Sequence, residues 1–550
     1  MEREIQRSGT GAQLLTETLA RAGVRTIFSL SGNQIMPVYD ACIDAGLRIV
    51  HVRHEAAAVA MADAYAQLTG EVGVALVTAA PGFLNALSPL YSARLSESPV
   101  LLLSGDSPVA QDGMGAFQEL AQTTISGPLA KRALRPLRAR DLGLEAASAI
   151  RAARAGRPGP VHMALAFDVL CAQTGSAVLP GAGDFVPQRQ PLDPGMADRI
   201  ATLVAEARRP VVLAGPSLSP SRAGDLATRL SQRLAAPVVP MESPRGLRDP
   251  ALGAFAEELS RADLVVLLGK TPDFTTGFLG GAALAEDAKL VVIDPETDAL
   301  DRAWRLAGER IVLAACTDTR AAAETLAAGT PLAARADWAE TVARSLAWRG
   351  DEPASGAAIH PVAVCRAVQR VLDAAQDAVL VCDGGEFGQW AQGYCTAGTR
   401  IVNGMSGAIG SGLCYAIAAK IARPGATVVA MMGDGTVGFH LAEFETALRE
   451  DAPFIALIGN DSRWNAEYQI QLRDYGADRL IGCELTADAR YDAVARALGC
   501  EGTLVTDAAA LPDALADAAT AAVPACVNVG IEGAPAPLFT RTGKPAASAH

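Results

Sequence analysis

Short apolar runs alternate along the chain with amphipathic or alanine-rich stretches. The runs predict buried strands, and the stretches between them carry apolar residues at helical spacing. Because strands and helices alternate in this way, we predict doubly wound α/β units with parallel sheets. In the N-terminal third, the predicted strands are residues 26–30, 49–53, 72–78 and 99–104, and the predicted helices include 9–22 and 35–45.

The alternation is interrupted twice. Residues 186–195 are polar and proline-rich, and residues 322–357 are alanine-rich, so both are interpreted as linkers. A chain of 550 residues is also too long for a single hydrophobic core. We therefore predict three domains and a mobile tail rich in Pro, Ala and Gly. The predicted boundaries are 1–185, 196–330 and 358–531 for the domains and 532–550 for the tail.

Composition and charge narrow the class of protein. The formal net charge is −13, which argues against a nucleic-acid partner. No uninterrupted apolar run is long enough to cross a bilayer, and the first residues lack the apolar core of a signal peptide. The ten cysteines form no CxxC pair, which is typical of a reducing compartment. We expect a cytoplasmic α/β protein without a nucleic-acid or membrane partner.

The most informative stretch is residues 431–471, MMGDGTVGFHLAEFETALREDAPFIALIGNDSRWNAEYQIQ. An apolar strand ends in GDG, a helix follows, and a second apolar strand ends in NDS. Because parallel strands end at one edge of a sheet, we expect Asp434 and Asp461 to meet there. With the carbonyl of Arg463, they would leave positions around Mg²⁺ for diphosphate oxygens. Gly435 and Thr436 open the helix, whose N-terminus favours phosphate.

This stretch resembles the diphosphate-binding signature of thiamine-diphosphate (ThDP) enzymes, which begins with GDG and ends in an Asn-rich pair. Asp461 stands where the second Asn is usual, and a carboxylate can also hold Mg²⁺. Three α/β domains in one chain resemble the ThDP decarboxylase and acetolactate synthase superfamily over nearly the whole sequence. The resemblance implies ThDP and Mg²⁺ as cofactors. It also implies a first domain that binds the aminopyrimidine, a nucleotide-type middle domain and a third domain that binds the diphosphate.

The resemblance implies roles for residues outside the signature. Glu55, in RHEAAA, would hydrogen-bond the aminopyrimidine ring and promote loss of the thiazolium proton. In NGMSGAIG, Ile409 would push between the cofactor rings, and the Gly407 carbonyl would accept from the pyrimidine amino group. Gly385 and Glu386, in DGGEF, would place backbone groups near the diphosphate.

Two further side chains are expected at the reacting carbon. Glu467, in SRWNAEYQ, is expected on a short helix facing the thiazolium, where a carboxylate could shuttle a proton. Trp464 and Asn465 would line the same pocket. Gln118, in GAFQE, resembles a residue that reaches the active site from across the subunit boundary. PGFLNAL at 81–87 resembles a loop that lies near the substrate.

The motifs also favour one branch of the superfamily. Ser31 and Gln34 stand where decarboxylases often carry His, which argues against a pyruvate-decarboxylase-type enzyme. PGFLN and GAFQE look most like 2-hydroxyacyl-CoA lyase and oxalyl-CoA decarboxylase, and RHEAAA and the helix after GDG also resemble benzaldehyde lyase. We therefore expect a carbon–carbon lyase that reversibly cleaves a 2-hydroxyacyl-CoA to formyl-CoA and an aldehyde or ketone.

Two alternatives stay open. The first is an acetolactate-synthase-like or benzaldehyde-lyase-like carboligase or decarboxylase that acts on free 2-keto or 2-hydroxy acids. The second is a ThDP-fold binding protein without catalysis, which the presence of Glu55, Asp434 and Asp461 argues against.

Ligands and partners follow from the same resemblance. Arg245, Arg541 and Lys544 are the basic candidates for the CoA phosphates, and in the CoA branch the tail can close over the substrate. Asp294, at the end of VVID, is a position that can hold an adenosine ribose, but the sequence does not distinguish ADP, FAD and an empty site. The resemblance implies a homodimer or homotetramer with active sites between subunits.

Overall fold

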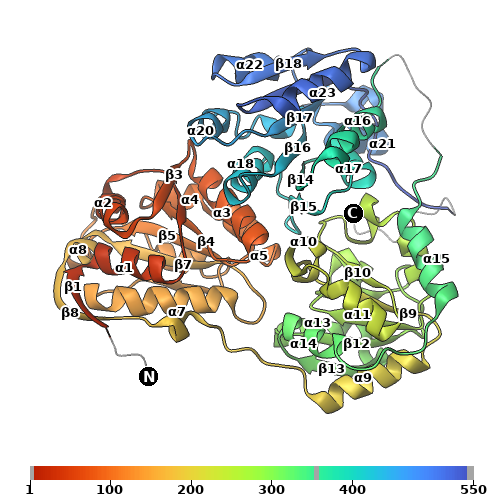
Figure 1. The fold of residues 1–550 in the computed structure, drawn as a ribbon, viewed down its shortest axis with the longest axis horizontal. Coiled ribbons are helices and arrows are strands. Elements are labelled where there is room, and N and C mark those ends of the chain that lie inside the picture. The colour runs from red at the N-terminus through yellow and green to blue at the C-terminus, as the bar shows by residue number, and fades with distance from the viewer. Residues whose placement is uncertain (1–4, 352–357, 542–550) are drawn as a thin grey trace.

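A computed structural model describes residues 5–351 and 358–541 of the chain. Three parallel β-sheets with helices on both faces lie in successive parts of the sequence, coloured red to orange, yellow to green and green to blue in Figure 1. The predicted doubly wound α/β architecture is therefore confirmed. Lys544 lies outside the described residues.

The N-terminal domain has strand order β3-β2-β4-β5-β7-β6, with every neighbouring pair parallel. Its strands are β2 (Thr26–Ser29), β3 (Arg48–His51), β4 (Gly73–Val77), β5 (Val100–Asp106), β6 (Arg132–Leu134) and β7 (Val161–Ala166). Its helices are α1 (Gly11–Arg21), α2 (Met36–Ala45), α3 (Glu55–Thr69), α4 (Pro81–Asn85), α5 (Leu87–Leu95), α6 (Gln122–Ser126), α7 (Leu142–Arg154) and α8 (Phe167–Cys171). An antiparallel pair, β1 (Ile5–Thr10) with β8 (Gln173–Leu179), was not predicted.

The central domain has strand order β10-β9-β11-β12-β13, again all parallel. Its strands are β9 (Pro210–Ala214), β10 (Val238–Pro240), β11 (Leu264–Leu268), β12 (Lys289–Asp294) and β13 (Ile311–Cys316). Its helices are α9 (Pro194–Glu206), α10 (Pro220–Ala223), α11 (Leu226–Leu234), α12 (Phe255–Leu259), α13 (Thr297–Ala307), α14 (Thr319–Ala327) and α15 (Ala336–Ala347). Helix α15 lies in the alanine-rich stretch interpreted as a linker, and its Trp338 indole donates to the Pro210 carbonyl at 2.9 Å.

The C-terminal domain has strand order β15-β14-β16-β17-β19-β18, all parallel. Its strands are β14 (Ala378–Asp383), β15 (Thr399–Val402), β16 (Thr427–Gly433), β17 (Ile455–Asn460), β18 (Glu501–Val505) and β19 (Ala525–Gly530). Its helices are α16 (Pro361–Ala374), α17 (Glu386–Tyr394), α18 (Gly412–Ala422), α19 (Asp434–Val437), α20 (Glu443–Arg449), α21 (Asn465–Tyr475), α22 (Tyr491–Ala497) and α23 (Leu511–Thr520).

The crossover from β16 to β17 differs from the prediction of one continuous helix. The structure has the short α19, a turn, and then α20. Gly438 weakens the helix at the turn, because glycine has a low helix propensity. Phe439, at this turn, is 54% exposed and packs edge-on against Trp464. The turn therefore directs an aromatic ring toward the loop that follows β17.

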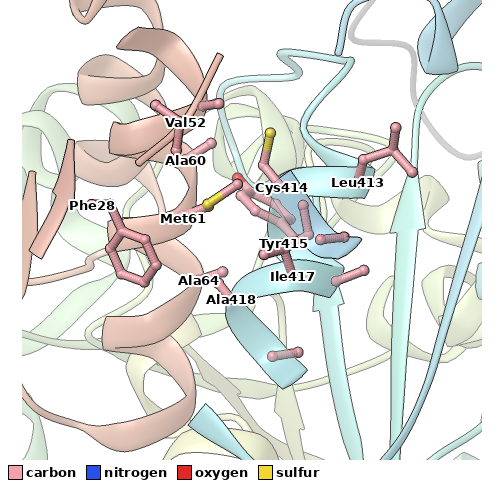
Figure 2. Close-up of a cluster of buried hydrophobic side chains, with 14 of the residues drawn as sticks. Phe28, Val52, Ala60, Met61, Ala64, Leu413, Cys414, Tyr415, Ile417 and Ala418 are labelled. Carbon is pink, nitrogen blue, oxygen red and sulfur yellow. The ribbon is translucent and has the colours of Figure 1, made fainter. Parts of the chain in front are cut away.

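The N-terminal and C-terminal domains share one apolar core. Helix α3 packs along α18, and Figure 2 shows Met61 and Ala64 of α3 facing Tyr415 and Ala418 of α18. The Tyr415 hydroxyl donates to Asp63 at 3.1 Å in the middle of this contact. Burying apolar surface on both helices fixes the two domains relative to each other.

Ion pairs between side chains join the central domain to the N-terminal domain. The Arg157 guanidinium contacts Glu97, donates to Asp294 and reaches Glu296 at 3.2 Å. It also donates to the Gly269 carbonyl at 3.1 Å. Because Glu97 and Asp294 are almost fully buried, this cation neutralises two carboxylates that have little access to water.

The described part of the tail, residues 532–541, crosses from the C-terminal domain to the central domain. Ile531 forms a parallel bridge with Ile359, and further along Phe539 packs edge-on against Tyr394. Arg541 then pairs with Glu257 at 3.1 Å and also contacts Glu258, both on α12. Among residues 5–351 and 358–541, no helix combines the length and apolar character that crossing a membrane requires.

Candidate cofactor site

Two aspartates stand side by side at the carboxyl edge of the C-terminal sheet. Strands β16 and β17 are parallel neighbours, with Gly433 paired to Gly459, and each is followed by one aspartate. Burial raises the pKa of Asp434 to about 6, and backbone N–H groups oppose this shift. Burial and the charge of Asp434 raise the pKa of Asp461 to about 7. The two carboxyls are thus close enough to repel each other, as the sequence predicted.

The chemistry of this pair fits a divalent cation. Asp434 is 2% exposed, and its Oδ2 has no hydrogen-bond partner among the described residues. Within the described ranges, no group of three or more His, Cys, Asp or Glu side chains could hold a metal. Two carboxylates would therefore need backbone and non-protein oxygens to complete the coordination of Mg²⁺. The carbonyl of Arg463 stays the predicted third protein ligand.

A second loop approaches the aspartates from β14. Gly384 has φ of +79°, and a Cβ at this position would lie 2.1 Å from Cγ2 of Thr436, one turn into α19. The DGG segment and the GDG helix are therefore in direct contact, and only glycine permits it. Gly385 and Glu386 follow at the start of α17, in the place expected for diphosphate contacts.

The GAIG loop is tied to the same strand end. The buried carboxylate of Asp383 accepts from the backbone N–H of Gly410 at 3.0 Å and of Gly412 at 2.6 Å. Burial raises the pKa of Asp383 to about 6 against these two donors. Gly407, with φ of +68°, and the half-buried Ile409 are held by this anchor beside the DGG loop. Asp383 was not given a role from the sequence, although it is the last residue of β14 and Asp434 directly follows β16.

A cavity of about 600 Å³ opens beside these loops. Helix α21 presents one face to it, the tail forms another wall, and the central domain closes a third side. Its lining includes Arg245, Arg248, Glu386, Gly407, Arg473 and Pro537. Arg245, a predicted ligand of the CoA phosphates, thus lines this cavity, whereas Arg541 lies outside it and pairs with Glu257 and Glu258 of α12.

Glu386 links the diphosphate loop to the tail. Its Oε2 accepts from the Ala536 backbone N–H at 3.0 Å and from the Gln389 amide at 3.2 Å. Burial raises the pKa of Glu386, the Arg245 charge opposes this, and the Glu467 charge adds to it. Glu467 is therefore near the cavity, in the first turn of α21. It is exposed and does not lie on the helix face that lines the cavity.

Glu55 lies in the N-terminal domain at the first turn of α3, 9% exposed. The Asn85 side-chain amide, at the end of α4, donates to its Oε2 at 3.0 Å. A Cβ on Gly82 would lie 3.2 Å from Oε1, so the other oxygen is closely approached by backbone. The PGFLN segment therefore lies beside Glu55, as expected for a loop at the active site. Its hydrogen bond to Glu55 had no signal in the sequence.

Gln118 also belongs to this half of the site. Its Oε1 accepts from Nε2 of Gln34 at 2.7 Å, and Thr78 in turn donates to Gln34. Gln118 has φ of +60° and Ala80 has φ of +43°, both unusual for residues with a side chain. Strained backbone of this kind gathers at functional sites. Thr78 and Ala80 were not singled out from the sequence.

Within one chain the N-terminal and C-terminal domains are joined near the site, by the Ser92 and Ser406 hydroxyls at 3.0 Å and by the Arg53 backbone N–H, which donates to Glu443 at 2.9 Å, but the contacts described for Glu55, Gln118 and the aspartate pair stay within their own domains. Glu55 bonds to Asn85 and Gln118 to Gln34, all within the N-terminal domain. The contacts described for Asp434 and Asp461 lie within the C-terminal domain. Large apolar side chains are exposed near both halves: Leu84, Met114, Phe117 and Phe439.

Asp294, the candidate ribose ligand of the central domain, is already engaged. One of its oxygens accepts from Arg157 and the other from the Glu296 backbone N–H at 3.0 Å. Glu97 and Glu296 also pair with Arg157 at this end of β12. Both oxygens of Asp294 are therefore already hydrogen-bonded within the chain, and a nucleotide at this strand end stays a prediction.

Three regions of the chain match known domain families. Residues 9–125, 197–324 and 383–529 match the N-terminal TPP binding, central and C-terminal TPP binding domains of thiamine pyrophosphate enzymes. A probable acetolactate synthase of Mycobacterium bovis is 31% identical over 531 residues, which cover 94% of this chain and 95% of that protein. The 2-hydroxyacyl-CoA lyase 2 of Bos taurus is 31% identical over 548 residues, covering 90% and 85%. That of Homo sapiens is 30% identical over 550 residues, covering 90% and 85%.

Proposed function

Because this chain belongs to the family of thiamine pyrophosphate enzymes, we propose that it is a ThDP- and Mg²⁺-dependent lyase acting on 2-hydroxyacyl-CoA. In the proposed reaction, the bond between the acyl carbon and the hydroxyl-bearing carbon breaks reversibly. The products are formyl-CoA and an aldehyde or ketone. The hydroxyl oxygen becomes the new carbonyl and loses its proton, and the acyl carbon gains one, so no oxidant or reductant is required.

The cavity beside Glu386 is the observation that carries the CoA part of the proposal. At about 600 Å³ it is within the range of sites for large ligands. It begins at the loops expected to hold the coenzyme and is lined by Arg245, Arg248 and Arg473. Guanidinium groups suit phosphates, because their donors match phosphate oxygens in geometry and charge. A free 2-keto acid would need neither the volume nor three arginines.

Bound ThDP supplies a nucleophilic carbon and accepts the electron pair of the broken bond. In this chain, Asp434 and Asp461 would hold Mg²⁺ and through it the diphosphate. Glu55 would hydrogen-bond the aminopyrimidine, and this is supported by Asn85, which donates to one of its carboxylate oxygens. Glu467 stays the proposed proton carrier between the substrate hydroxyl and the acyl carbon, although it lies outside the face of α21 that lines the cavity.

A second copy of the chain is the proposed partner that completes the site. Glu55 and the aspartate pair make their described contacts in different domains. The exposed Leu84, Phe117 and Phe439 supply apolar surface that association would bury. We place each active site between the N-terminal domain of one protomer and the C-terminal domain of its partner.

A carboligase that forms acetolactate from pyruvate is the second candidate. The relative from Mycobacterium bovis favours it, because that probable acetolactate synthase aligns over 94% of this chain. The two candidates share the coenzyme, and they differ in whether a CoA group must be bound.

The deciding experiment offers both substrates to the full chain with ThDP and Mg²⁺. We expect formyl-CoA and an aldehyde from a 2-hydroxyacyl-CoA, and no acetolactate from pyruvate. Glu55→Gln serves as the inactive control, since it removes the carboxylate and keeps the shape of the side chain. Acetolactate formation without cleavage of the thioester would replace the lyase assignment with the second candidate.

Coenzyme binding is measured separately by thermal shift. Ligand at about a hundred times its dissociation constant should add about 2.7 kcal/mol to the free energy of unfolding. An unchanged unfolding temperature with ThDP and Mg²⁺ would contradict both enzymatic assignments.

A further inference from the structure

Three polar side chains are joined in line at the carboxyl edge of the N-terminal sheet. Thr78 follows β4, Gln34 lies in the short helix η1 (Asn33–Ile35) after β2, and Gln118 lies in the loop after β5. The Thr78 hydroxyl donates to Gln34 Oε1 at 2.7 Å. Gln34 Nε2 donates to Gln118 Oε1 at 2.7 Å. Since β2, β4 and β5 are neighbours in the sheet, their ends bring these residues together.

The row formed by Thr78, Gln34 and Gln118 is tightly packed and lies next to Glu55. Gln34 is 6% exposed, and a Cβ on Gly105 would lie 2.8 Å from its own Cβ. At the other end, Thr78 and Glu55 both approach Gly82. A Cβ there would lie 2.8 Å from Thr78 Cγ2 and 3.2 Å from Glu55 Oε1. Gln34 therefore has little freedom to turn, and the line runs beside the carboxylate expected to contact the coenzyme.

The loop that carries Gln118 is folded around one carboxylate. Glu119 accepts from the backbone N–H groups of Gly113, Gly115 and Ala116 at 2.5, 2.9 and 3.1 Å. This closes the turn and leaves Phe117 75% exposed. Gln118 itself has φ of +60° and points toward Gln34. The loop holds an unfavourable backbone conformation that directs one amide inward.

A primary amide has one accepting and one donating end. Gln34 occupies the accepting end of Gln118, so Nε2 of Gln118 is the end left for a ligand. We propose that Gln34 and Thr78 are positioning residues that fix the direction of the Gln118 amide, so that its N–H group donates to the substrate oxygen that gains negative charge. This rests on the proposed function and on the predicted role of Gln118, which resembles a residue that reaches the active site. Fixed donors of this kind stabilise a developing oxyanion without reorganising.

Substitutions at Gln34 test the direction of the amide. In Gln34→Glu the carboxylate can only accept, so Gln118 must turn its Nε2 inward and present its oxygen to the substrate. We expect kcat to fall at least about ten-fold, as in Gln118→Ala. Gln34→Met removes the hydrogen bond to Gln118 without forcing its amide into either orientation, so kcat should fall less than in Gln34→Glu. As the pH falls, a protonated Glu at position 34 can donate again, so the loss in Gln34→Glu should shrink while that in Gln34→Met stays constant.

A double-mutant cycle tests Thr78. Thr78→Val should lower kcat by about two- to five-fold in the parent protein and leave it unchanged in a Gln118→Ala background. Thr202→Val, which removes a hydroxyl bonded to Asp198 on the exposed side of α9, is the matched control. Equal losses in both backgrounds would mean that Thr78 acts only through stability. Parent-like kcat in Gln34→Glu would overturn the assigned direction.

The double-mutant cycle is run with whichever substrate the parent protein converts. It therefore remains a valid test of the amide direction if the enzyme proves to be the carboligase and not the lyase. A neutron structure of the deuterated protein reads the amide direction without turnover. Deuterons on Gln34 Nε2 facing Gln118 Oε1 are expected. Deuterons on Gln118 Nε2 facing Gln34 would contradict the proposal, whatever the enzyme acts on.

Discussion

Among the residues at the carboxyl edges of the sheets, some contacts could be predicted from the sequence and others could not. The pairing of Asp434 with Asp461 was predictable, because parallel neighbouring strands end at one edge. The relation of Gln34 to Gln118 was not, because it joins residues 84 positions apart through a loop with an unusual φ. Hydrogen bonds between loops depend on backbone conformations that composition and periodicity do not encode.

The aspartate pair predicts that the stability of the folded protein depends on pH in the direction opposite to that given by most carboxylates. The pKa values of about 6 and about 7 in the folded chain lie above the ordinary value of 3.8. The folded state therefore binds protons that the unfolded state releases, and the metal-free protein gains stability as the pH falls from about 7 to about 4. Thermal unfolding with EDTA at pH 7.5 and pH 5 measures this gain.

Asp461→Asn should remove much of this effect. One buried charge disappears, so the metal-free protein should be more stable at pH 7.5 by on the order of 1–2 kcal/mol and should respond less to acid. The amide oxygen still suits Mg²⁺, which should bind more weakly. Asp301→Asn, on the exposed side of α13, is the control and should change neither property. A loss of stability at pH 7.5 would contradict the repulsion between residues 434 and 461.

Elements were predicted better than their interruptions. All three parallel sheets follow from apolar runs, because a strand covered on both faces must be apolar along its length. The break between α19 and α20 was missed, since Phe439 continues the apolar period but packs against Trp464 on another element. The antiparallel pair β1–β8 was missed because its polar residues give no clear alternation.

The contact between the DGG turn and α19 gives a prediction at this scale. Gly384→Ala places a Cβ within 2.1 Å of Thr436 at a φ that favours glycine, so the two phosphate loops must separate. We expect ThDP to bind at least about ten-fold more weakly, measured by calorimetry with Mg²⁺. Gly425→Ala, which has open space around it, should bind ThDP like the parent protein. Equal affinities for all three proteins would mean that these loops do not hold the diphosphate.

At the scale of the whole molecule, the arrangement of domains combines an apolar contact and an ionic one. Helices α3 and α18 bury a common core. Arg157 and Glu97 of the N-terminal domain meet Asp294 of the central domain in the ionic contact. Three domains were predictable from chain length and the two composition breaks. The contacts between domains were not, because the partners of Arg157 and Tyr415 lie 137 and 352 positions away in the sequence.

A site divided between protomers predicts complementation. Glu55→Gln and Asp434→Ala should each be inactive alone. A hybrid dimer has one pocket carrying both changes and one carrying neither, so random exchange should restore about a quarter of the parent activity. The measurement is turnover after the two proteins are unfolded together and refolded, with tagged chains to confirm exchange. No recovery in confirmed hybrids would place both halves of the site in a single chain.

The path of residues 532–541 has a consequence for synthesis. This segment is made after all three sheets, yet it forms a wall of the cavity and ends against α12. A ribosome that stops just beyond β19 would release a polypeptide with every sheet and both aspartates but with one side of the cavity missing. A measurement of ligand retention would reveal the missing wall.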